Sequence, residues 1–238
     1  GIELFTETEI LSIEAKEQGV SVKFIHSSSE IIRQGAVLFN ALGRIPNTNN
    51  LNLESAGISL QSSGHIRTNP FQQTSNPIVY AAGDCCGPHE IVHTAIFQGE
   101  IAGKHFLGEN PKPVNYDHLT KVIFTDPQVA SVGIPLDQLD GDSVRYLSAE
   151  YPFNDHGKSI LMEAEYGFVK VWALENGQVL GAECVGRDAG ELIHSLAIAV
   201  ALNAKVSDLL NTHWYHPTLS EIWTYPLEEI ASKIESLY

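Results

Sequence analysis

The sequence predicts an α+β chain in which an antiparallel sheet with helices is preceded by an incomplete α/β portion. In the C-terminal half, strand-like segments come first and an amphipathic helical segment follows at 189–202, an order typical of α+β folds. In the N-terminal half, a short apolar run at 78–82 leads through Gly83 and Asp84 into a helical pattern over 93–107. This strand–loop–helix unit accounts for the α/β portion.

Composition and charge limit the classes of partner. The 238 residues are 43% hydrophobic, which can fill one or two domain cores. Lys and Arg total 14 against 29 Asp and Glu, and the resulting net charge of −15 repels phosphate backbones. The longest strongly apolar stretch, 192–202, is far shorter than the ~20 residues of a bilayer span. We therefore expect neither a nucleic-acid partner nor a membrane-spanning segment.

The first element expected along the chain is a small β-meander. Residues 20–25 alternate between polar and apolar side chains, 27–29 supply turn chemistry, and 36–42 form a second apolar run. The meander ends where Gly43 and Pro46 force a change of direction. We therefore place a domain boundary after residue 43.

Two prolines within 110–116 end the helical pattern of 93–107 and suit a linker, so a second domain is expected over 44–115 and a third over 116–238. In the third domain, the turn residues Asn176 and Gly177 mark a tight hairpin between the last two strands. The amphipathic segment must bury its apolar stripe. The strands are expected at 129–132, 168–172 and 179–185, and the helix at 189–202.

The cysteines and histidines give no sign of a disulfide framework or a metal site. Cys85 and Cys86 are adjacent and Cys184 is distant, and no set of four His or Cys ligands is completed nearby. Because the three cysteines form no disulfide framework, we expect the protein in a reducing cytoplasm. The chain starts without Met or a signal sequence, and we expect it to be the C-terminal portion of a longer protein.

The segment whose side chains are best suited to catalysis is 216–221, His-Pro-Thr-Leu-Ser-Glu. Thr218 and Glu221 have the spacing of a capping box, a purely structural role. Alternatively, His216 precedes a helix start and Glu221 orients its ring, making the imidazole a general acid or base with an ordinary pKa of about 6.5. The spacing favours the capping box, and the two roles are compatible.

An ordered set of motifs resembles the disulfide-reductase flavoproteins, the family that includes dihydrolipoamide dehydrogenases. The motifs are Ala-Leu-Gly-Arg-Ile-Pro-Asn at 41–47, Tyr-Ala-Ala-Gly-Asp at 80–84, Phe-Thr-Asp-Pro at 124–127 followed by Ala-Ser-Val-Gly at 130–133, and 216–221. Each motif alone is weak, but their order and separations match the family over essentially the whole chain. The resemblance implies that the three expected domains are the end of an NAD(P)-binding domain, the second half of an FAD-binding domain and a dimerisation domain.

The resemblance also implies roles for individual residues. Gly43 becomes a backbone contact at the nicotinamide-domain junction, Asp84 the carboxylate that bonds the ribityl chain of FAD, and Val92 a backbone donor to the flavin ring. His216 and Glu221 become catalytic residues that reach into the partner's site of a homodimer, where the imidazole exchanges protons with a redox-active dithiol. The cofactors implied are FAD and NAD(P), and the substrate is a small-molecule or lipoyl disulfide.

Some departures from the family pattern leave alternatives open. The family's Gly-x-Gly-x-x-Gly fingerprint and Cys-x-x-x-x-Cys pair do not occur in this chain, so we expect the chain alone to be inactive. Dihydrolipoamide dehydrogenases usually carry a second His two places before His216, where this chain has Trp214. Mercuric reductases and soluble transhydrogenases, which generally show Tyr at the His216 position, are the alternative enzymes. A stand-alone dimerisation module is the non-enzymatic alternative.

Overall fold

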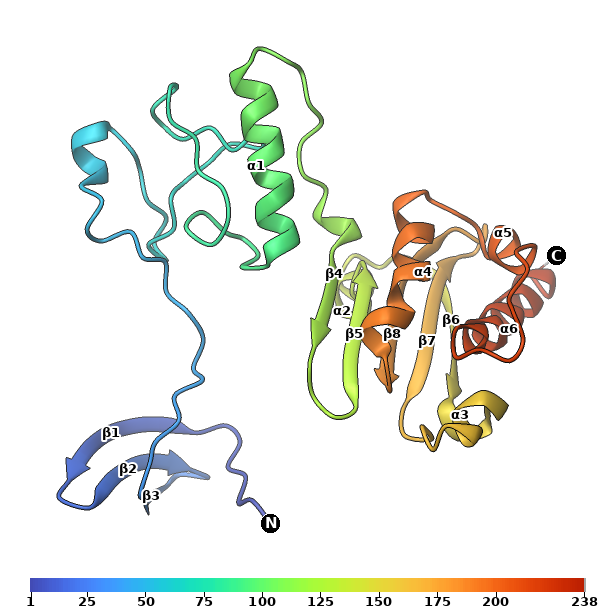
Figure 1. Cartoon of the computed structure of the whole chain (residues 1–238), viewed down its shortest axis with the longest axis horizontal. Helices are drawn as coiled ribbons and strands as arrows, with labels where there is room; N and C mark the ends of the chain where they lie inside the picture. The colour runs from blue at the N-terminus through green and yellow to red at the C-terminus, as the bar shows by residue number, and fades with distance from the viewer. Residues whose placement is uncertain (238) are drawn as a thin grey trace. The chain divides into compact units, whose positions relative to one another are not determined.

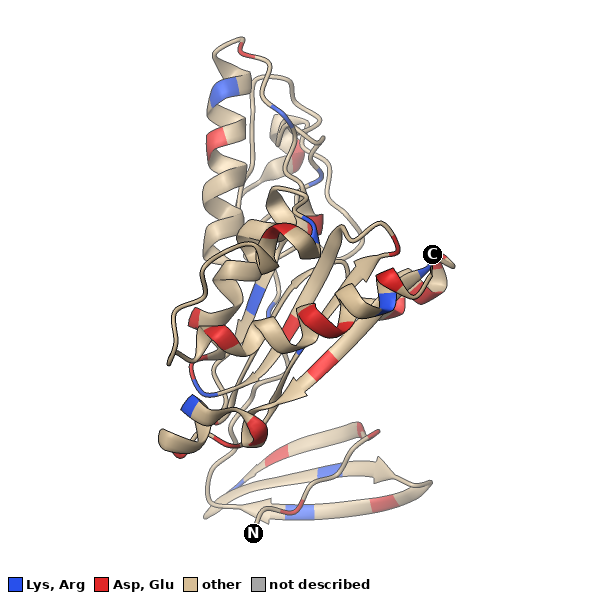
Figure 2. Cartoon of the chain, turned by 90° about the vertical axis from the view of Figure 1, so that its right-hand side faces the viewer, with Lys and Arg blue, Asp and Glu red and all other residues tan. Residues whose placement is uncertain are grey.

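The computed structural model describes residues 1–237 and divides the chain into two compact units, Gly1–Pro111 and Lys112–Tyr238. Figure 1 shows their elements. Acidic positions recur along the strands and helices of both units, whereas basic positions are fewer (Figure 2). Among the described residues, no helix is both long and apolar enough to cross a membrane. The mixture of antiparallel sheets and helices confirms the predicted α+β class.

The first unit begins with an antiparallel three-stranded sheet of order β1-β2-β3. A two-residue turn joins β2 to β3, and its residues Ser27 and Ser28 have φ angles of 50° and 63°. Positive φ at both central positions suits the twist of a tight hairpin. The strands are β1 (Glu9–Lys16), β2 (Gly19–His26) and β3 (Ser29–Gly35).

The expected strand at 36–42 is wrong. The third strand of the meander is β3, whereas Val37 and Phe39, in the extended segment that follows it, are 86% and 88% exposed. A continuous apolar run is typical of a strand buried on both faces, and no strand of the described chain pairs with this one. The expected strand at 78–82 is likewise reduced to one bridge, between Gln73 and Tyr80.

Helix α1 confirms the helical pattern of 93–107, and part of its apolar surface is exposed. Ile96 and Phe97 are 56% and 57% exposed, while the polar Thr94 and Gln98 are buried. The Gln98 amide fastens α1 to the preceding loop, because it accepts from Gly83 N at 2.6 Å and donates to Gly87 O at 2.8 Å. The remaining elements of this unit are η1 (Leu53–Ala56) and α1 (Val92–Phe106).

The second unit is built on a five-stranded antiparallel sheet of order β4-β5-β8-β7-β6. The predicted strands at 129–132, 168–172 and 179–185 are confirmed, whereas β4 and β6 were not predicted. The strands are β4 (Thr120–Ile123), β5 (Gln128–Gly133), β6 (Tyr146–Pro152), β7 (Phe168–Leu174) and β8 (Val179–Gly186).

Helices cover this sheet, with α4 packed on β5 and β8 and α6 packed on β6 and β7 (Figure 1). The amphipathic segment 189–202 is confirmed as α4, and its apolar stripe is buried. The helices are α2 (Leu136–Gly141), α3 (Gly157–Leu161), α4 (Ala189–Ala201), α5 (Val206–Leu210) and α6 (Thr224–Glu235), with short 3-10 turns η2 (Tyr116–His118), η3 (Phe153–Asp155) and η4 (Ser220–Trp223).

Two buried tryptophans tie the core of the second unit together. Trp172 of β7 is 1% exposed and donates to Ile134 O at 2.9 Å. Trp223 of η4 is fully buried and donates to Leu192 O of α4 at 3.1 Å. A buried indole needs a partner for its N–H, and these two bonds satisfy both rings. The short turn η4 is therefore fixed to α4.

The predicted hairpin between β7 and β8 is confirmed, and it brings Gly181 against the ring of Trp172. Gly177 in its turn has a φ of 88°, a conformation that glycine adopts without strain. A Cβ at Gly181 would lie 2.5 Å from the indole of Trp172 and 2.7 Å from Val132 O. The close approach of β7, β8 and β5 thus depends on glycine, which has no side chain, at position 181.

We expect Gly181→Ala to lower the free energy of unfolding of the second unit by about 1–3 kcal/mol, the usual cost of overpacking. All three tryptophans lie in this unit, so tryptophan fluorescence in a urea titration reports its unfolding. Gly141→Ala is the matched control, because a Cβ there meets no atom within 4 Å. Equal unfolding midpoints for the two variants would contradict the packing argument.

Candidate functional site

The strongest candidate site is the contact between His216 and Glu221 in the second unit. His216 Nδ1 lies 3.1 Å from Glu221 Oε1 and 3.0 Å from Oε2. The imidazole is 82% exposed, whereas the carboxylate, on the buried turn η4, is only 12% exposed. The structure thus brings together the two residues that the sequence predicts as catalytic, with a fixed carboxylate behind an accessible ring.

Only half of the predicted capping box forms. Thr218 Oγ1 accepts a hydrogen bond from Glu221 N at 3.3 Å and donates one to Tyr215 O at 2.8 Å. In the reciprocal half of a capping box, the carboxylate reaches back to the cap amide. Here the Glu221 carboxylate faces His216 instead. The backbone of Glu221 is therefore used for capping and its side chain for orienting an imidazole.

A second histidine, His156, faces Glu221 from the core side. Its Nε2 lies 3.4 Å from Glu221 Oε1, its Nδ1 lies 2.8 Å from Ser159 Oγ, and the residue is 1% exposed. Burial lowers the pKa of His156 below its ordinary value, the nearby Glu221 carboxylate raises it in part, and His216 lowers it. The sequence analysis did not single out His156, because an isolated histidine in the 153–159 loop carries no pattern.

Two stacked tyrosines form the wall beside His156. The ring of Tyr225 meets the imidazole edge-on at 6.0 Å, and the Tyr151 ring stacks on Tyr225 at 3.9 Å. The Tyr151 hydroxyl donates to the Asp155 carboxylate at 3.0 Å. Burial, followed by this contact, raises the pKa of Tyr151 to about 12. Tyr151 therefore stays protonated near neutral pH and serves as a hydrogen-bond donor.

The three predicted cofactor-binding residues lie in the first unit. Asp84 follows the extended segment 78–82 and forms an ion pair with Arg44, the neighbour of Gly43. Arg44 Nε also lies 3.5 Å from Glu90 Oε2, and Glu90 Oε1 lies 3.3 Å from His65 Nε2. The structure therefore brings the segment that contains Gly43 beside Asp84. The Asp84 carboxylate remains 43% exposed and can still accept hydrogen bonds.

Val92 and Gly43 offer backbone rather than side-chain chemistry. Val92 opens α1, whose N-cap residue Ile91 makes no side-chain cap. The first amides of a helix have no intrahelical acceptor, so this end suits an electron-rich ligand. Gly43 has a φ of 98°, and a Cβ there would meet nothing within 4 Å. Gly43 therefore leaves space for a ligand to approach the main chain, and Val92 is 77% exposed.

Of the two adjacent cysteines, Cys85 is partly exposed and Cys86 is buried. Cys86 is 3% exposed and packs with Ile58, Ile66 and Ala81. Burial, followed by the neighbouring Cys85, raises the pKa of its thiol to about 12. All three cysteines are free thiols. Because the thiolate is the reactive form, the buried Cys86 thiol serves for packing.

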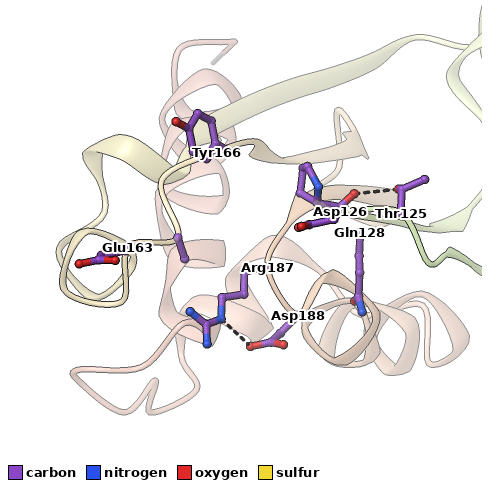
Figure 3. A pocket seen from close by; sticks show the side chains of 9 residues that line it. Thr125, Asp126, Gln128, Glu163, Tyr166, Arg187 and Asp188 are labelled. Carbon is purple, nitrogen blue, oxygen red and sulfur yellow. Dashed lines mark hydrogen bonds and ion pairs between the residues drawn. The ribbon is translucent and has the colours of Figure 1, made fainter. Parts of the chain in front are cut away.

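A pocket of about 430 Å³ lies elsewhere in the second unit, between the β4–β5 turn, the segment before β7 and the start of α4. Figure 3 shows Arg187 and Asp188 in contact at its edge, with a closest Nε to Oδ2 distance of 3.9 Å. Carboxylates outnumber cations in its lining. None of the predicted site residues lines it, and the described part of the chain holds no cluster of metal-ligating side chains.

Two family models match the chain. Residues 1–99 match the pyridine nucleotide-disulphide oxidoreductase model, and residues 119–226 match the dimerisation domain of the same proteins. A dihydrolipoyl dehydrogenase from Bacillus subtilis is 31% identical over 97% of this chain and 49% of the relative. An NAD(P)H dehydrogenase (quinone) from Mycobacterium tuberculosis is also 31% identical, over 92% of this chain and 44% of the relative.

Solved structures agree with these matches. The crystal structure of LpdA from Mycobacterium tuberculosis superposes with a TM-score of 0.88 at 30% identity, covering 97% of this chain and 50% of that one. The flavoprotein disulfide reductase RclA from Escherichia coli shares the fold with a TM-score of 0.80 at 21% identity, covering 92% and 50%. The chain thus spans about half the length of the relatives it matches. Because the two models together cover most of its length, the chain belongs to the pyridine nucleotide-disulfide oxidoreductase family.

Proposed function

We propose that this chain forms half of the FAD site and the dimerisation domain of an FAD-dependent NAD(P)H:disulfide oxidoreductase similar to dihydrolipoyl dehydrogenase. The observation that carries this proposal is the pairing of the exposed His216 imidazole with the shielded Glu221 carboxylate at 3.0 Å. We assign 1–43 to the end of the NAD(P)-binding domain, 44–115 to the FAD-binding domain and 116–238 to the dimerisation domain.

The pairing suits His216 to accept a proton from a thiol. Glu221 faces Nδ1, and a carboxylate in that position selects the tautomer with the proton on Nδ1. The lone pair on Nε2 is then available at an exposed edge of the ring. When Nε2 takes the proton, the Glu221 charge stabilises the imidazolium. The thiol becomes a thiolate, which is the reactive species in disulfide exchange.

The residues of the first unit fit a flavin. FAD, when bound, passes electron pairs between a pyridine nucleotide and a disulfide. Asp84, held in place by Arg44, would accept hydrogen bonds from the hydroxyls of the ribityl chain, and the Val92 amide would donate to the ring. Gly43 would make a backbone contact at the junction with the nicotinamide domain. The free cysteines of the chain agree with a reducing cytoplasm as its location.

The dithiol must come from a segment other than 1–238, because this sequence contains no Cys-x-x-x-x-Cys pair and Cys86 is buried. His216 projects outward with 82% of its side chain exposed. We therefore propose a homodimer in which His216 serves the partner's dithiol. A small-molecule or lipoyl disulfide is the substrate.

Four other functions remain as alternatives. Reduction of a quinone, suggested by the name of one relative, needs no base for a thiol and leaves the His216–Glu221 pair without a role. Mercuric reductases and soluble transhydrogenases generally show Tyr at the His216 position. The presence of His216 therefore disfavours both of these activities. A stand-alone dimerisation module would bind no flavin. Turnover with lipoamide, a quinone, Hg(II) and a second pyridine nucleotide separates the enzymes.

We expect the chain to form a homodimer in solution. Tyr215, Leu202 and Ile198 of the second unit are 80%, 73% and 61% exposed, and large apolar side chains gathered on one unit favour association. Size-exclusion chromatography with light scattering should give twice the 26.0 kDa of the chain at micromolar concentration. A species of 26.0 kDa alone would contradict the proposed interface.

We also expect an effect of His216→Gln in the longer enzyme that includes the redox-active cysteines. The substitution should slow the reaction between dithiol and disulfide, the dithiol half-reaction, by the ~10²- to 10⁴-fold typical of a lost general base. Reduction of the flavin by NAD(P)H should change much less, because it transfers no thiol proton. Glu221→Gln should slow the same step by a smaller factor, since the ring remains. Stopped-flow absorbance of the flavin follows both half-reactions.

Thr218→Ala is the matched control for this prediction. It removes the hydroxyl that accepts from Glu221 N but leaves the carboxylate facing His216. Loss of such a cap costs about 0.5–2 kcal/mol of stability, and the kinetic effect should be far below that of His216→Gln. Full dithiol turnover in His216→Gln would show that the segment 216–221 is structural.

A further inference from the structure

His156 is a buried side chain to which the proposed reaction assigns no role. It is 1% exposed, yet its Nε2 makes no hydrogen bond within the described chain. Buried polar atoms are almost always paired, so an unpaired ring nitrogen calls for an explanation. The polar atom that it faces is Oε1 of Glu221, 3.4 Å away. This is the same oxygen that lies 3.1 Å from His216 Nδ1.

The surroundings of His156 determine which form of the ring faces Glu221. Ser159 Oγ lies 2.8 Å from Nδ1, and a hydroxyl that donates to Nδ1 leaves the proton on Nε2. Tyr225 packs edge-on against the ring and Tyr151 stacks on the far side of Tyr225, while Glu221 and His216 are the groups whose charge acts on it. Burial lowers the pKa of His156, so the neutral ring with an N–H toward Glu221 prevails near pH 7.

We propose that His156 is a positioning residue, whose Nε2–H holds Oε1 of Glu221 from the core side so that the carboxylate stays aligned on His216 Nδ1. This inference rests on the proposed function of His216. A small rotation of either side chain would turn the 3.4 Å approach into a hydrogen bond and would satisfy the unpaired nitrogen. Such contacts commonly tighten when the reacting groups assemble.

The contact between His156 and Glu221 explains why the Glu221 carboxylate stays below the surface. The carboxylate is 12% exposed, and a half-buried anion needs donors on more than one side. His216 supplies one donor on the exposed side, and Ser159, by fixing the His156 tautomer, makes a second donor available on the core side. Without the second donor, the carboxylate gains by turning toward water and away from Nδ1 of His216.

Two substitutions separate this role from simple packing. In His156→Phe the ring remains but the donor is lost, whereas in His156→Gln the amide N–H takes the place of Nε2–H. In the enzyme with its dithiol half, we expect His156→Phe to slow the dithiol half-reaction by about 10-fold, the lower end for the loss of an outer hydrogen-bond partner. We expect His156→Gln to restore most of this rate and neither variant to change flavin reduction by NAD(P)H.

A double-mutant cycle distinguishes an effect of His156 that acts through Glu221 from an effect on the stability of the fold. If His156 acts through Glu221, His156→Phe has no further effect in a Glu221→Gln background. An equal loss in both backgrounds, or a wild-type dithiol rate in His156→Phe, overturns the inference. Circular dichroism of each variant identifies unfolding. A wild-type enzyme with no dithiol turnover would instead refute the proposed function.

A nuclear magnetic resonance titration tests the contact without any turnover, in the chain as it stands. The Glu221 carboxylate raises the pKa of His156, so Glu221→Gln should lower it further. The Cε1–H resonance of His156, assigned from its loss in His156→Gln, follows this change. A His156 pKa that is the same in wild type and Glu221→Gln overturns the inference whatever the activity of the enzyme.

Discussion

The contact between Glu221 and His216 is the constraint on which the proposed chemistry depends. An imidazole that is 82% exposed has no fixed orientation of its own, and a carboxylate within 3.0 Å of Nδ1 gives it one. The carboxylate must itself be immobile to do this. The burial of Ile222 and Trp223 fixes the backbone of η4, from which the Glu221 side chain extends. The reactive edge of His216 is thus set by the packing of residues that never meet a substrate.

The second unit supplies that packing through a short chain of contacts. Trp223 bonds to Leu192 O of α4, and α4 lies across β5 and β8. On the other side of Glu221, η3 and α3 bring His156 and Ser159 under the carboxylate, and α6 adds Tyr225. Elements far apart in the sequence therefore converge on one carboxylate. The first unit contributes separately, through Asp84 and its ion pair with Arg44.

The sequence predicted the parts of this arrangement that repeat a pattern or a motif. The period of 189–202 predicted α4, the Asn176–Gly177 turn predicted the β7–β8 hairpin, and 216–221 predicted the His216–Glu221 pair. The apolar run at 36–42 was misread because strand formation there needs a neighbouring strand, which periodicity does not reveal. His156 was missed because its meaning comes from a tertiary contact across 65 residues of sequence, 156 to 221.

The claim that His216 serves the partner's dithiol is tested most directly by mixing two inactive variants of the enzyme. One carries His216→Gln and the other lacks the redox cysteines. If His216 acts across the interface, half of the randomly paired dimers contain one intact site, and about one quarter of the wild-type dithiol turnover returns. If His216 acts within its own subunit, no dimer contains an intact site. Turnover that stays at the level of the separate variants would contradict the account.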